Sequence, residues 1–499
     1  MLLALVLIPI LAAFAILGGT KPRLAAIAAA GLNLALGLAA AFTPKAGFWN
    51  FSLGVVSTPE IHLSLGLYDG MSVIMLLLAV IVTMAAILSG KSPEGREKLY
   101  YASSLLISAG AIGAFVATDL FFFYAFHELA LIPTFLMIGI MGRGDRRAIA
   151  WKITIYLGFG SLVLLAGLLW LANLTGTFSI PQMLENGPVD PAAQKGIAAL
   201  LIVGFGILIS LFPFHSWAAP AYASAPAPTA MLHAGVLKKF GLYGLLRLAI
   251  PLVPEGMEAW LTPLCVLLLG NILWVGYVTI NQKRLDGVLG NSSVMHMGYI
   301  FLAIAALAAS YQGEALAGTI VDSEAVTLAS AARFTNDLAQ PAAVLLMFAH
   351  GISIAMAFGL ADRIERKTGS LDMADLGGLA KPAPGLAFLF GLVTMASIGL
   401  PGLANFAGEV MVFISSFRNY DPAAGLGPVQ ITCILAIWGV VISAVYGLRA
   451  FRRTFQGPVR PTTEGATDLS WCERAPALLL AVVLLAVGIF PNLLLSLLK

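Results

Sequence analysis

Apolar runs of roughly 20 residues recur along almost the whole chain, separated by short polar connections. A run of this length can cross a bilayer as a helix, and irregular backbone cannot face lipid, so most of the chain is expected to be α-helical. The first run lacks a basic leading region and is interpreted as a span, not as a cleaved signal. The pattern predicts about fourteen spans, at 1–18, 22–42, 70–89, 102–119, 120–141, 152–173, 196–214, 228–249, 259–281, 285–308, 334–361, 382–418, 430–450 and 475–497.

Two local patterns depart from simple spanning helices. The run 382–418 is too long for one straight helix, and its sequence GLPG at 399–402 breaks helices, which predicts a discontinuous helix. The loop 43–69 alternates apolar and polar residues over short stretches, which predicts a small β-hairpin on the outer face. The longest polar connection is 309–333.

The composition supports a membrane location. The 499 residues are 59% hydrophobic and 11% charged, whereas a soluble domain carries about 25% charged residues. We therefore expect one integral, multi-pass membrane domain over 1–499. Cys265, Cys433 and Cys472 lack the spacing of a metal site. The chain also lacks a dinucleotide motif, so no cofactor, metal or nucleic acid is expected to bind to it.

The placement of charge orients the predicted spans. Of the 28 lysines and arginines, 20 fall in connections on one face and 6 on the other, while Lys238 and Lys239 lie within a span. Because cytoplasmic loops carry an excess of basic residues, the face with 20 of them is predicted to be cytoplasmic. Both termini then lie on the opposite face, and a bacterial inner (plasma) membrane is the expected location.

Four ionisable residues, Glu128, Lys238, Lys239 and Glu409, lie inside otherwise apolar runs. A charge at membrane depth costs several kcal/mol, so an ionisable residue there is a functional hypothesis by default. Burial disfavours the charged form of such a group and makes proton exchange easier. The order acid, base, acid outlines a proton path. The alternative is that these groups pair only to assemble the helices.

Five of the six histidines also lie in or at the edge of predicted spans. Ser292 and His296 are four residues apart, as are Asn405 and Glu409, so each pair shares a helix face. This distribution favours a proton relay over isolated core histidines. The proline-rich, uncharged stretch 212–230 is either an ordinary loop or the mouth of a water-filled cavity. The five histidines are His127, His215, His233, His296 and His350.

Several motifs resemble those of a known family. They are FHELALIPTFLMIG, FPFHSW…APTA…GVLKKFGLYGLLR, SSVMHMGY and GLPGLANFAGE. In these motifs the chain resembles, over nearly all of its length, the antiporter-like subunits of respiratory complex I, the proton-translocating NADH–quinone oxidoreductase. It is most similar to the M type (mitochondrial chain 4 type), because that type carries a glutamate at the position of Glu409.

The resemblance implies an all-α polytopic fold with two inverted five-helix repeats that contain discontinuous helices. Residues 1–100 would form the N-terminal spans, 102–249 the first half-channel, 259–450 the second and 475–497 the C-terminal span. The chain would couple quinone reduction to proton pumping as a translocase subunit without a redox centre. NADH, FMN, Fe–S clusters and quinone would bind other subunits, and chains of the L and N types would be its neighbours.

The resemblance also implies roles for individual residues. Glu128 would pair with Lys239 and modulate its proton affinity. Protons would reach Lys239 from the cytoplasm, pass along a hydrated axis through His296 and leave near Glu409. The supporting residues would be Lys238, His233, His215, His350 and Asp286.

Two stretches depart from the family pattern. The chain reads Arg284-Leu285-Asp286 where the family usually has an acid, a leucine and a lysine. Either Arg284 or Lys283 replaces that lysine, or His296 carries the middle of the path, or coupling is altered. The stretch 217–222 is neutral where the family's is charged.

Other functions stay open at this point. The same motifs occur in Mrp-type cation/proton antiporter subunits and in pump subunits of membrane-bound hydrogenases. A structural scaffold and a small-solute transporter are further alternatives, and the sequence does not distinguish H⁺ from Na⁺ as the transported ion.

Overall fold

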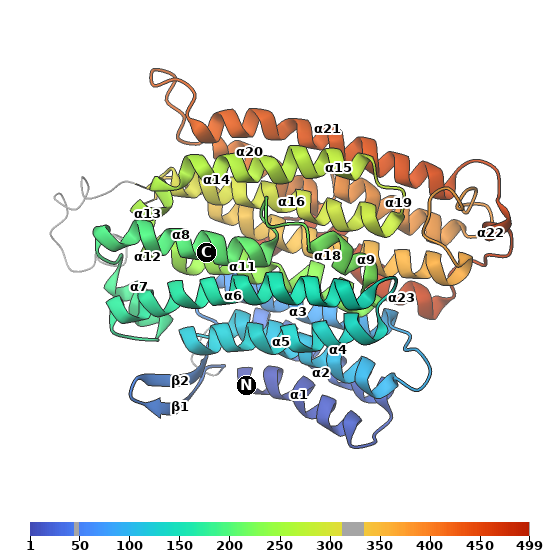
Figure 1. Cartoon of the computed structure of the whole chain (residues 1–499), viewed down its shortest axis with the longest axis horizontal. Helices are drawn as coiled ribbons and strands as arrows, with labels where there is room; N and C mark the ends of the chain where they lie inside the picture. The colour runs from blue at the N-terminus through green and yellow to red at the C-terminus, as the bar shows by residue number, and fades with distance from the viewer. Residues whose placement is uncertain (44–48, 312–333, 499) are drawn as a thin grey trace.

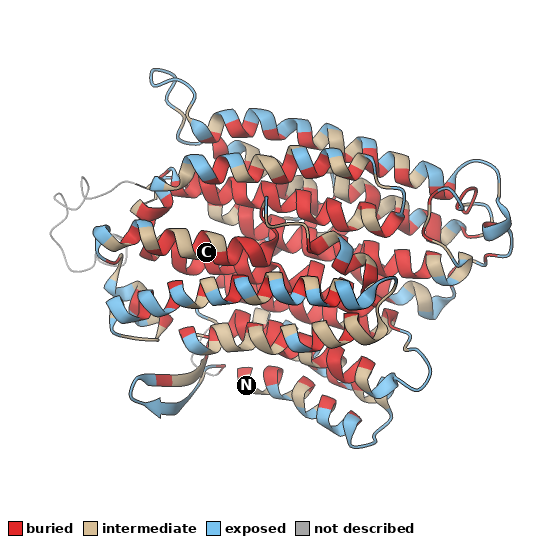
Figure 2. Ribbon diagram, in the orientation of Figure 1, coloured by how far each residue is buried: buried red, intermediate tan, exposed pale blue. Residues whose placement is uncertain are grey.

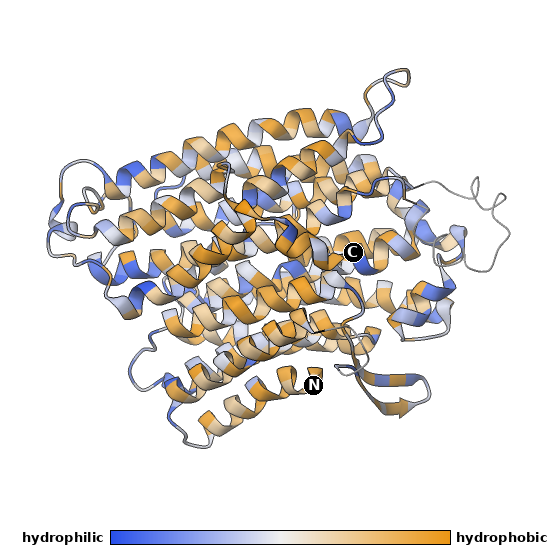
Figure 3. Cartoon of the chain, turned by 180° about the vertical axis from the view of Figure 1, so that it is seen from behind, coloured by the Kyte–Doolittle hydropathy of each residue, from blue (hydrophilic) through white to orange (hydrophobic). Residues whose placement is uncertain are grey.

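The computed structural model describes residues 1–43, 49–311 and 334–498, so most of the predicted connection 309–333 lies outside the described residues. Within the described part, 11 helices are long and apolar enough to cross a membrane, and two shorter apolar helices accompany them. The helices run side by side, with polar residues gathered at the two ends of the bundle and apolar residues between them (Figure 3). The predicted all-helical, multi-pass fold is thereby confirmed.

The N-terminal part consists of four helices and a hairpin. Its elements are α1 (Leu2–Leu17), α2 (Pro22–Phe42), β1 (Phe51–Ser57), β2 (Glu60–Leu65), α3 (Gly70–Ser89) and α4 (Glu97–Val116). The two strands pair antiparallel, with Phe51 opposite Leu65, which confirms the predicted β-hairpin. The hairpin lies at the end of the bundle opposite to α22 (Pro461–Glu464) (Figure 1).

The next part of the chain contains long helices followed by short, irregular ones. The long helices are α5 (Leu120–Met141), α6 (Arg146–Thr175) and α8 (Pro191–Ile209), with the short α7 (Ile180–Asn186) between the last two. The irregular elements are α9 (Ala218–Ser224), α10 (Ala227–Leu232), the π-turn η1 (His233–Leu237), α11 (Lys239–Gly244), the π-turn η2 (Leu245–Ala249), α12 (Ile250–Leu252) and α13 (Pro254–Ala259). The predicted span 228–249 is therefore not one regular α-helix, because two π-turns interrupt it.

The second half repeats the alternation of long and broken helices. Its elements are α14 (Leu261–Leu269), the π-turn η3 (Gly270–Val275), α15 (Gly276–Ile280), α16 (Leu285–Ala308), α18 (Ala339–Thr368), α19 (Pro384–Ile398), α20 (Ala404–Ser416), α21 (Pro428–Phe455), α22, α23 (Trp471–Ile489), α24 (Asn492–Leu495) and the 3-10 turn η5 (Ser496–Leu498). The helix break predicted at 399–402 is confirmed, since α19 ends just before it and α20 begins just after it.

Four helices form the centre of the bundle. The apolar stretches of α3, α4 and α16 are 89% buried and that of α18 is 100% buried, whereas that of α21 is only 39% buried. Figure 2 shows this contrast between the buried interior and the outer helices. Outer helices expose large apolar side chains such as Trp438 and Phe159, as expected for surfaces that face lipid. Polar side chains on the central helices are consequently shielded from lipid by protein.

Close packing of α4 on α5 gives a first testable prediction. A β-carbon at Gly110 would lie 2.5 Å from the carbonyl oxygen of Phe126 and 2.9 Å from the amide nitrogen of Ala130. Because both atoms belong to backbone, Gly110→Leu should destabilise the fold by about 3 kcal/mol and strongly reduce the amount of chain in membranes, measured by immunoblot. Gly31→Leu is the matched control, since nothing lies within 4 Å of a β-carbon there. Equal amounts of both variants would contradict the packing argument.

Candidate functional site

Lys239 begins α11, one residue after the π-turn η1 ends, and is completely buried. Its Nζ donates hydrogen bonds to the carbonyl oxygen of Ala234 at 2.7 Å and to Nδ1 of His350 on α18 at 2.9 Å. The two helices can approach because both carry glycine: a β-carbon at Gly351 would lie 2.6 Å from the carbonyl oxygen of Gly235. This backbone contact places the ammonium group beside the imidazole.

Lys238 points to a different part of the bundle. Its Nζ lies 3.4 Å from the carbonyl oxygen and 3.5 Å from the hydroxyl of Ser293 on α16, and 5.5 Å from the centre of the Tyr222 ring. Side chains at neighbouring helix positions point about 100° apart, so the two lysines contact different residues. Of the two ammonium groups, that of Lys239 is the one hydrogen-bonded to an imidazole, the ring of His350.

His296 lies between His350 and Glu409. Its ring centre is 5.6 Å from that of His350. Nδ1 of His296 is 2.7 Å from the carbonyl oxygen of Ser292, and Nε2 is 2.9 Å from the carbonyl oxygen of Ser397. A neutral imidazole carries one N–H, so only the protonated ring donates to both carbonyls at once. The surroundings of this ring therefore accommodate an additional proton.

Glu409 is the last of four neighbouring buried groups, Lys239, His350, His296 and Glu409, which together form a row through the bundle. Its Oε1 lies 3.9 Å from Nε2 of His296. The carboxylate rests against the break between α19 and α20, where Gly399 has a φ of +81° and a β-carbon would collide with Oε2 of Glu409. Glycine is therefore required at this position both by the left-handed backbone and by the space for the acid. Asn405, which is also in α20, donates a hydrogen bond to the hydroxyl of Ser353 on α18. This bond ties α20 to the central helix α18.

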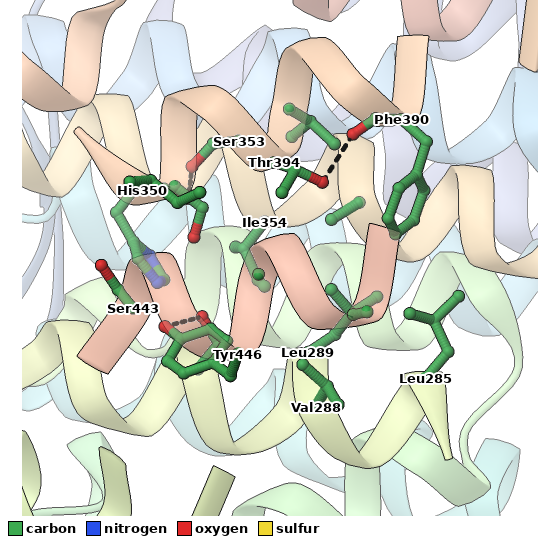
Figure 4. A pocket seen from close by; sticks show the side chains of 17 residues that line it. Leu285, Val288, Leu289, His350, Ser353, Ile354, Phe390, Thr394, Ser443 and Tyr446 are labelled. Atoms are coloured by element: carbon green, nitrogen blue, oxygen red, sulfur yellow. Dashed lines mark hydrogen bonds between the residues drawn. The ribbon is translucent and has the colours of Figure 1, made fainter. Parts of the chain in front are cut away.

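A cavity of about 40 Å³ adjoins these groups (Figure 4). Its polar lining includes His350, Ser292, Ser443 and Tyr446, and the hydroxyls of Ser292 and Tyr446 are 2.8 Å apart. A buried water needs about 10–15 Å³ and two to four polar partners, so the space is sufficient for two or three waters. Water here would connect His350 to Ser292 and so to His296.

Glu128 is separate from this row. Its Oε1 accepts a hydrogen bond of 2.5 Å from Ser161 on α6 and lies 3.5 Å from Nδ1 of His127. About 35% of its side chain is exposed, and it borders a cavity of about 210 Å³ between α5 and α6. The resemblance implied a pair with Lys239, but these two described side chains form no ion pair here. Glu128 faces α6, whereas the ammonium of Lys239 faces α18.

The remaining candidates lie around the row and not within it. His127 stacks on Phe240 with ring centres 4.1 Å apart. His233 is buried, and its Nδ1 is 3.3 Å from the hydroxyl of Tyr222. His215 is half-buried and stacks on Phe212 in the turn before α9. Among the described residues, the ammonium of Lys239 is hydrogen-bonded to Ala234 and His350 and not to any of these three rings.

The unusual stretch Arg284-Leu285-Asp286 lies at the start of α16, with Arg284 as its N-cap residue. Asp286 is buried and accepts two hydrogen bonds from Arg284, of 2.8 and 3.2 Å, while half of the arginine side chain is exposed. This local ion pair is ten residues before His296 on the same helix. Arg284 is thus engaged in a local pair with Asp286, whereas His296 lies between His350 and Glu409.

Sequence reasoning missed several partners of the row. The hydroxyl of Tyr446 is hydrogen-bonded to that of Ser292, and the carbonyl oxygen of Ser397 is hydrogen-bonded to Nε2 of His296. A tyrosine and a serine in apolar helices carry no sequence signal of such contacts. No group of three or more His, Cys, Asp or Glu side chains suited to a metal ion occurs within residues 1–43, 49–311 and 334–498.

Comparison with known proteins identifies the family. The family model described as "NADH:quinone oxidoreductase/Mrp antiporter, TM" matches residues 117–323 and 325–434. The chain belongs to this family. The part of the chain that matches the NADH:quinone oxidoreductase/Mrp antiporter family contains Glu128, Lys239, His296 and Glu409.

Two similar relatives are both described as NAD(P)H-quinone oxidoreductase chain 4. The protein from Synechococcus sp. (strain JA-3-3Ab) is 32% identical over 506 residues, covering 98% of this chain and 90% of the relative. The protein from Microcystis aeruginosa is 32% identical over 467 residues, covering 91% of this chain and 79% of the relative.

Two solved structures share the fold of this chain. A chain of respiratory complex I from Thermus thermophilus with bound NADH matches with a TM-score of 0.86 and 28% identity, covering 100% of this chain and 98% of that chain. A chain of the Mrp complex from Dietzia sp. matches with a TM-score of 0.80 and 21% identity, covering 99% and 95%. At that identity the second likeness shows the fold alone.

Proposed function

We propose that this chain is a proton-translocating, antiporter-like membrane subunit of an NADH–quinone oxidoreductase of the complex I type. The observation that carries the proposal is the row of buried groups Lys239, His350, His296 and Glu409, which joins residues 170 positions apart in sequence across the bundle. Relatives described as chain 4 of NAD(P)H-quinone oxidoreductase and the likeness to a complex I chain support it.

Each member of the row can accept and release a proton. The ammonium of Lys239 already donates to His350, so a proton can pass along an existing hydrogen bond. From His350 it would reach His296 through water in the adjoining cavity, and from His296 it would reach Glu409. The chain would supply the path, while NADH, FMN, Fe–S clusters and quinone would bind other subunits and provide the energy.

Glu128 would act on the row from outside it. Approach of its carboxylate to Lys239 would stabilise the charged ammonium, and separation, as in this structure, would favour release of the proton. A shift of α5 against α11 would produce this change. Lys238, His233, His215 and Asp286 would support the path as further polar groups near it.

The proposed arrangement in the membrane follows from charge and repeat organisation. Residues 102–249 and 259–450 would form two inverted half-channel repeats, flanked by 1–100 and 475–497. The end of the bundle with the basic loops would face the cytoplasm of a bacterial cell, with both termini on the other side. Antiporter-like chains of the L and N types would lie beside it.

An Mrp-type cation/proton antiporter subunit is the second candidate, because the family model covers both classes. The two differ in their energy source. A complex I subunit would move ions only with quinone reduction, whereas an Mrp subunit would exchange Na⁺ for H⁺ without electron transfer.

The proposal predicts the effect of His350→Phe. Phenylalanine retains the ring shape but lacks both nitrogens, so the step between Lys239 and His296 should be interrupted. We expect the protons translocated per electron to fall at least about tenfold. The measurement compares NADH oxidation with the proton gradient in vesicles that contain the whole complex.

His62→Phe is the matched control for this experiment. His62 lies on the hairpin, pairs with Glu60 and is far from the row, so its replacement should leave pumping unchanged. Normal pumping by an assembled His350→Phe complex would show that the row is a structural feature and that the chain is a scaffold.

A further inference from the structure

A buried asparagine lies beside the break between α8 and α9, which comprises residues 210–217. Asn271 belongs to the π-turn η3 and is completely buried. Its Oδ1 accepts a hydrogen bond of 2.7 Å from the amide of Phe212, and its Nδ2 donates to the carbonyl oxygens of Ser210 and Val294, both at 3.0 Å. One side chain therefore joins three segments of backbone: the break, η3 and α16.

Two of these bonds stabilise the break. Ser210 follows α8 with a φ of +71°, in the left-handed region that residues with a β-carbon rarely adopt. Such a conformation persists only where the surroundings hold it. Both Ser210 and Phe212 lie beyond the last residue of α8, and the side-chain amide of Asn271 provides a hydrogen-bond partner for each.

The third bond is not needed to satisfy the break. Val294 lies inside the continuous helix α16, where a backbone carbonyl accepts from the amide four residues later. A carbonyl oxygen has two lone pairs, and at Val294 the second one accepts from Asn271. This bond therefore ties η3, and with it the break, to α16.

The bond reaches the turn of α16 that carries His296. Nδ1 of His296 lies 2.7 Å from the carbonyl oxygen of Ser292, and the ammonium of Lys238 lies 3.4 Å from that of Ser293. The side chains of His296, Lys238 and Asn271 thus contact three successive carbonyls, at 292, 293 and 294. A displacement of this turn, residues 292–296, would move the carbonyl that His296 contacts.

Close packing brings the three segments within reach of one short side chain. A β-carbon at Gly270 would lie 2.5 Å from Cγ of Phe212, and one at Gly298 would lie 2.5 Å from Cγ1 of Ile272 on η3. Glycine at the first position lets η3 approach the break, and glycine at the second lets α16 approach η3. At this spacing the amide of asparagine contacts both neighbours at once.

We infer that Asn271 is a positioning residue that holds the turn 292–296 of α16 in a fixed place relative to the break after α8. The inference rests on the proposed function, in which His296 passes the translocated proton to Glu409. Asn271 takes up no proton itself, because an amide does not titrate; it keeps the carbonyl of Ser292 in place for the imidazole. A movement of the break would reach His296 through this side chain.

The first test compares proton translocation with assembly in whole complexes. Leucine has nearly the shape of asparagine but forms no hydrogen bonds. Asn271→Leu should therefore lower the protons translocated per electron several-fold in complexes that assemble and oxidise NADH. A residue with a merely structural role would change the amount of complex and leave that ratio as in wild type.

Asn281→Leu is the matched control for this test. Asn281 is exposed at the end of α15, and its side-chain amide donates to the carbonyl of Tyr277 at 3.1 Å within the same helix. Its replacement removes a buried-site asparagine from neither the break nor α16, so the protons translocated per electron should equal those of wild type. An equal loss in both leucine variants would overturn the inference.

The second measurement follows the two tied segments directly, by hydrogen exchange of backbone amides in the whole complex, detected by mass spectrometry. Asn271→Leu should speed exchange several-fold over residues 210–212 and 292–296, whereas Asn281→Leu should speed neither. Unchanged exchange over 292–296 would overturn the inference whatever the pumping shows.

The two measurements together separate this inference from the proposed function. Faster exchange with a normal ratio of protons to electrons would overturn the inference alone if His350→Phe lowers pumping, and would overturn both if His350→Phe pumps normally. If Asn271→Leu does not assemble, Asn271→Ala serves instead, because it removes the same three bonds without adding bulk. The same loss of pumping per electron is expected, and a normal ratio would contradict the positioning role.

Discussion

Replacing Lys239 with alanine is expected to abolish proton translocation by the complex. The substitution removes the ammonium that donates to His350 and leaves that imidazole without its proton donor at the start of the row. Loss of a positioned proton donor typically lowers a proton-transfer rate by about 10²–10⁴-fold, so translocation should fall below detection. The measurement compares substrate oxidation with the gradient generated in membranes that carry the native complex.

Lys238→Ala provides the internal comparison for that result. The ammonium of Lys238 contacts Ser293 and the ring of Tyr222 instead of His350, so its loss should reduce pumping much less. Normal pumping per electron in an assembled Lys239→Ala complex would mean that Lys239 is structural. The role of the central base would then move to Lys238 or be abandoned.

Glu409→Gln should have the second largest effect. Glutamine has nearly the same shape and can still form hydrogen bonds beside Gly399, but it cannot take up and release a proton. Because Glu409 is the last member of the row, protons that reach His296 would have no acceptor beyond it. We expect pumping to fall roughly tenfold or more with the complex fully assembled, measured as protons translocated per electron.

Glu409→Asp tests whether the carboxyl group itself is required. Aspartate retains the acid but is shorter by one methylene, so the distance to His296, now 3.9 Å, would increase. Partial recovery of pumping relative to Glu409→Gln would support an acid at this position. Equal pumping by wild type and Glu409→Gln would remove Glu409 from the path.

The membrane architecture could be predicted from the sequence because its signals are local. Hydropathy marked the spanning helices, the GLPG sequence marked the break before α20, and short alternation marked the hairpin. The ionisable residues were also visible, since each stands out in an apolar run. The two π-turns on either side of α11 could not be predicted. In the folded chain η1 packs against α18 and η2 against α8, and such tertiary packing leaves no mark in composition.

The connections between the ionisable residues depend on tertiary structure. Lys239 and His350 are 111 residues apart, and their contact is possible because Gly235 and Gly351 let two backbones meet. A motif can show that Glu128 and Lys239 both exist, but not that one faces α6 while the other faces α18. For the same reason, the sequence named His296 and Glu409 as candidates without showing that they are neighbours.

The contact between Gly235 and Gly351 also sets how closely η1 can approach α18. A β-carbon at position 351 would lie 2.6 Å from the carbonyl oxygen of Gly235, so any larger residue there would push the two elements apart. The hydrogen bond between Lys239 and His350, now 2.9 Å, joins the part of the chain just after η1 to α18. A residue without any ionisable group, Gly351, is therefore a precondition for contact between a proton donor and its acceptor.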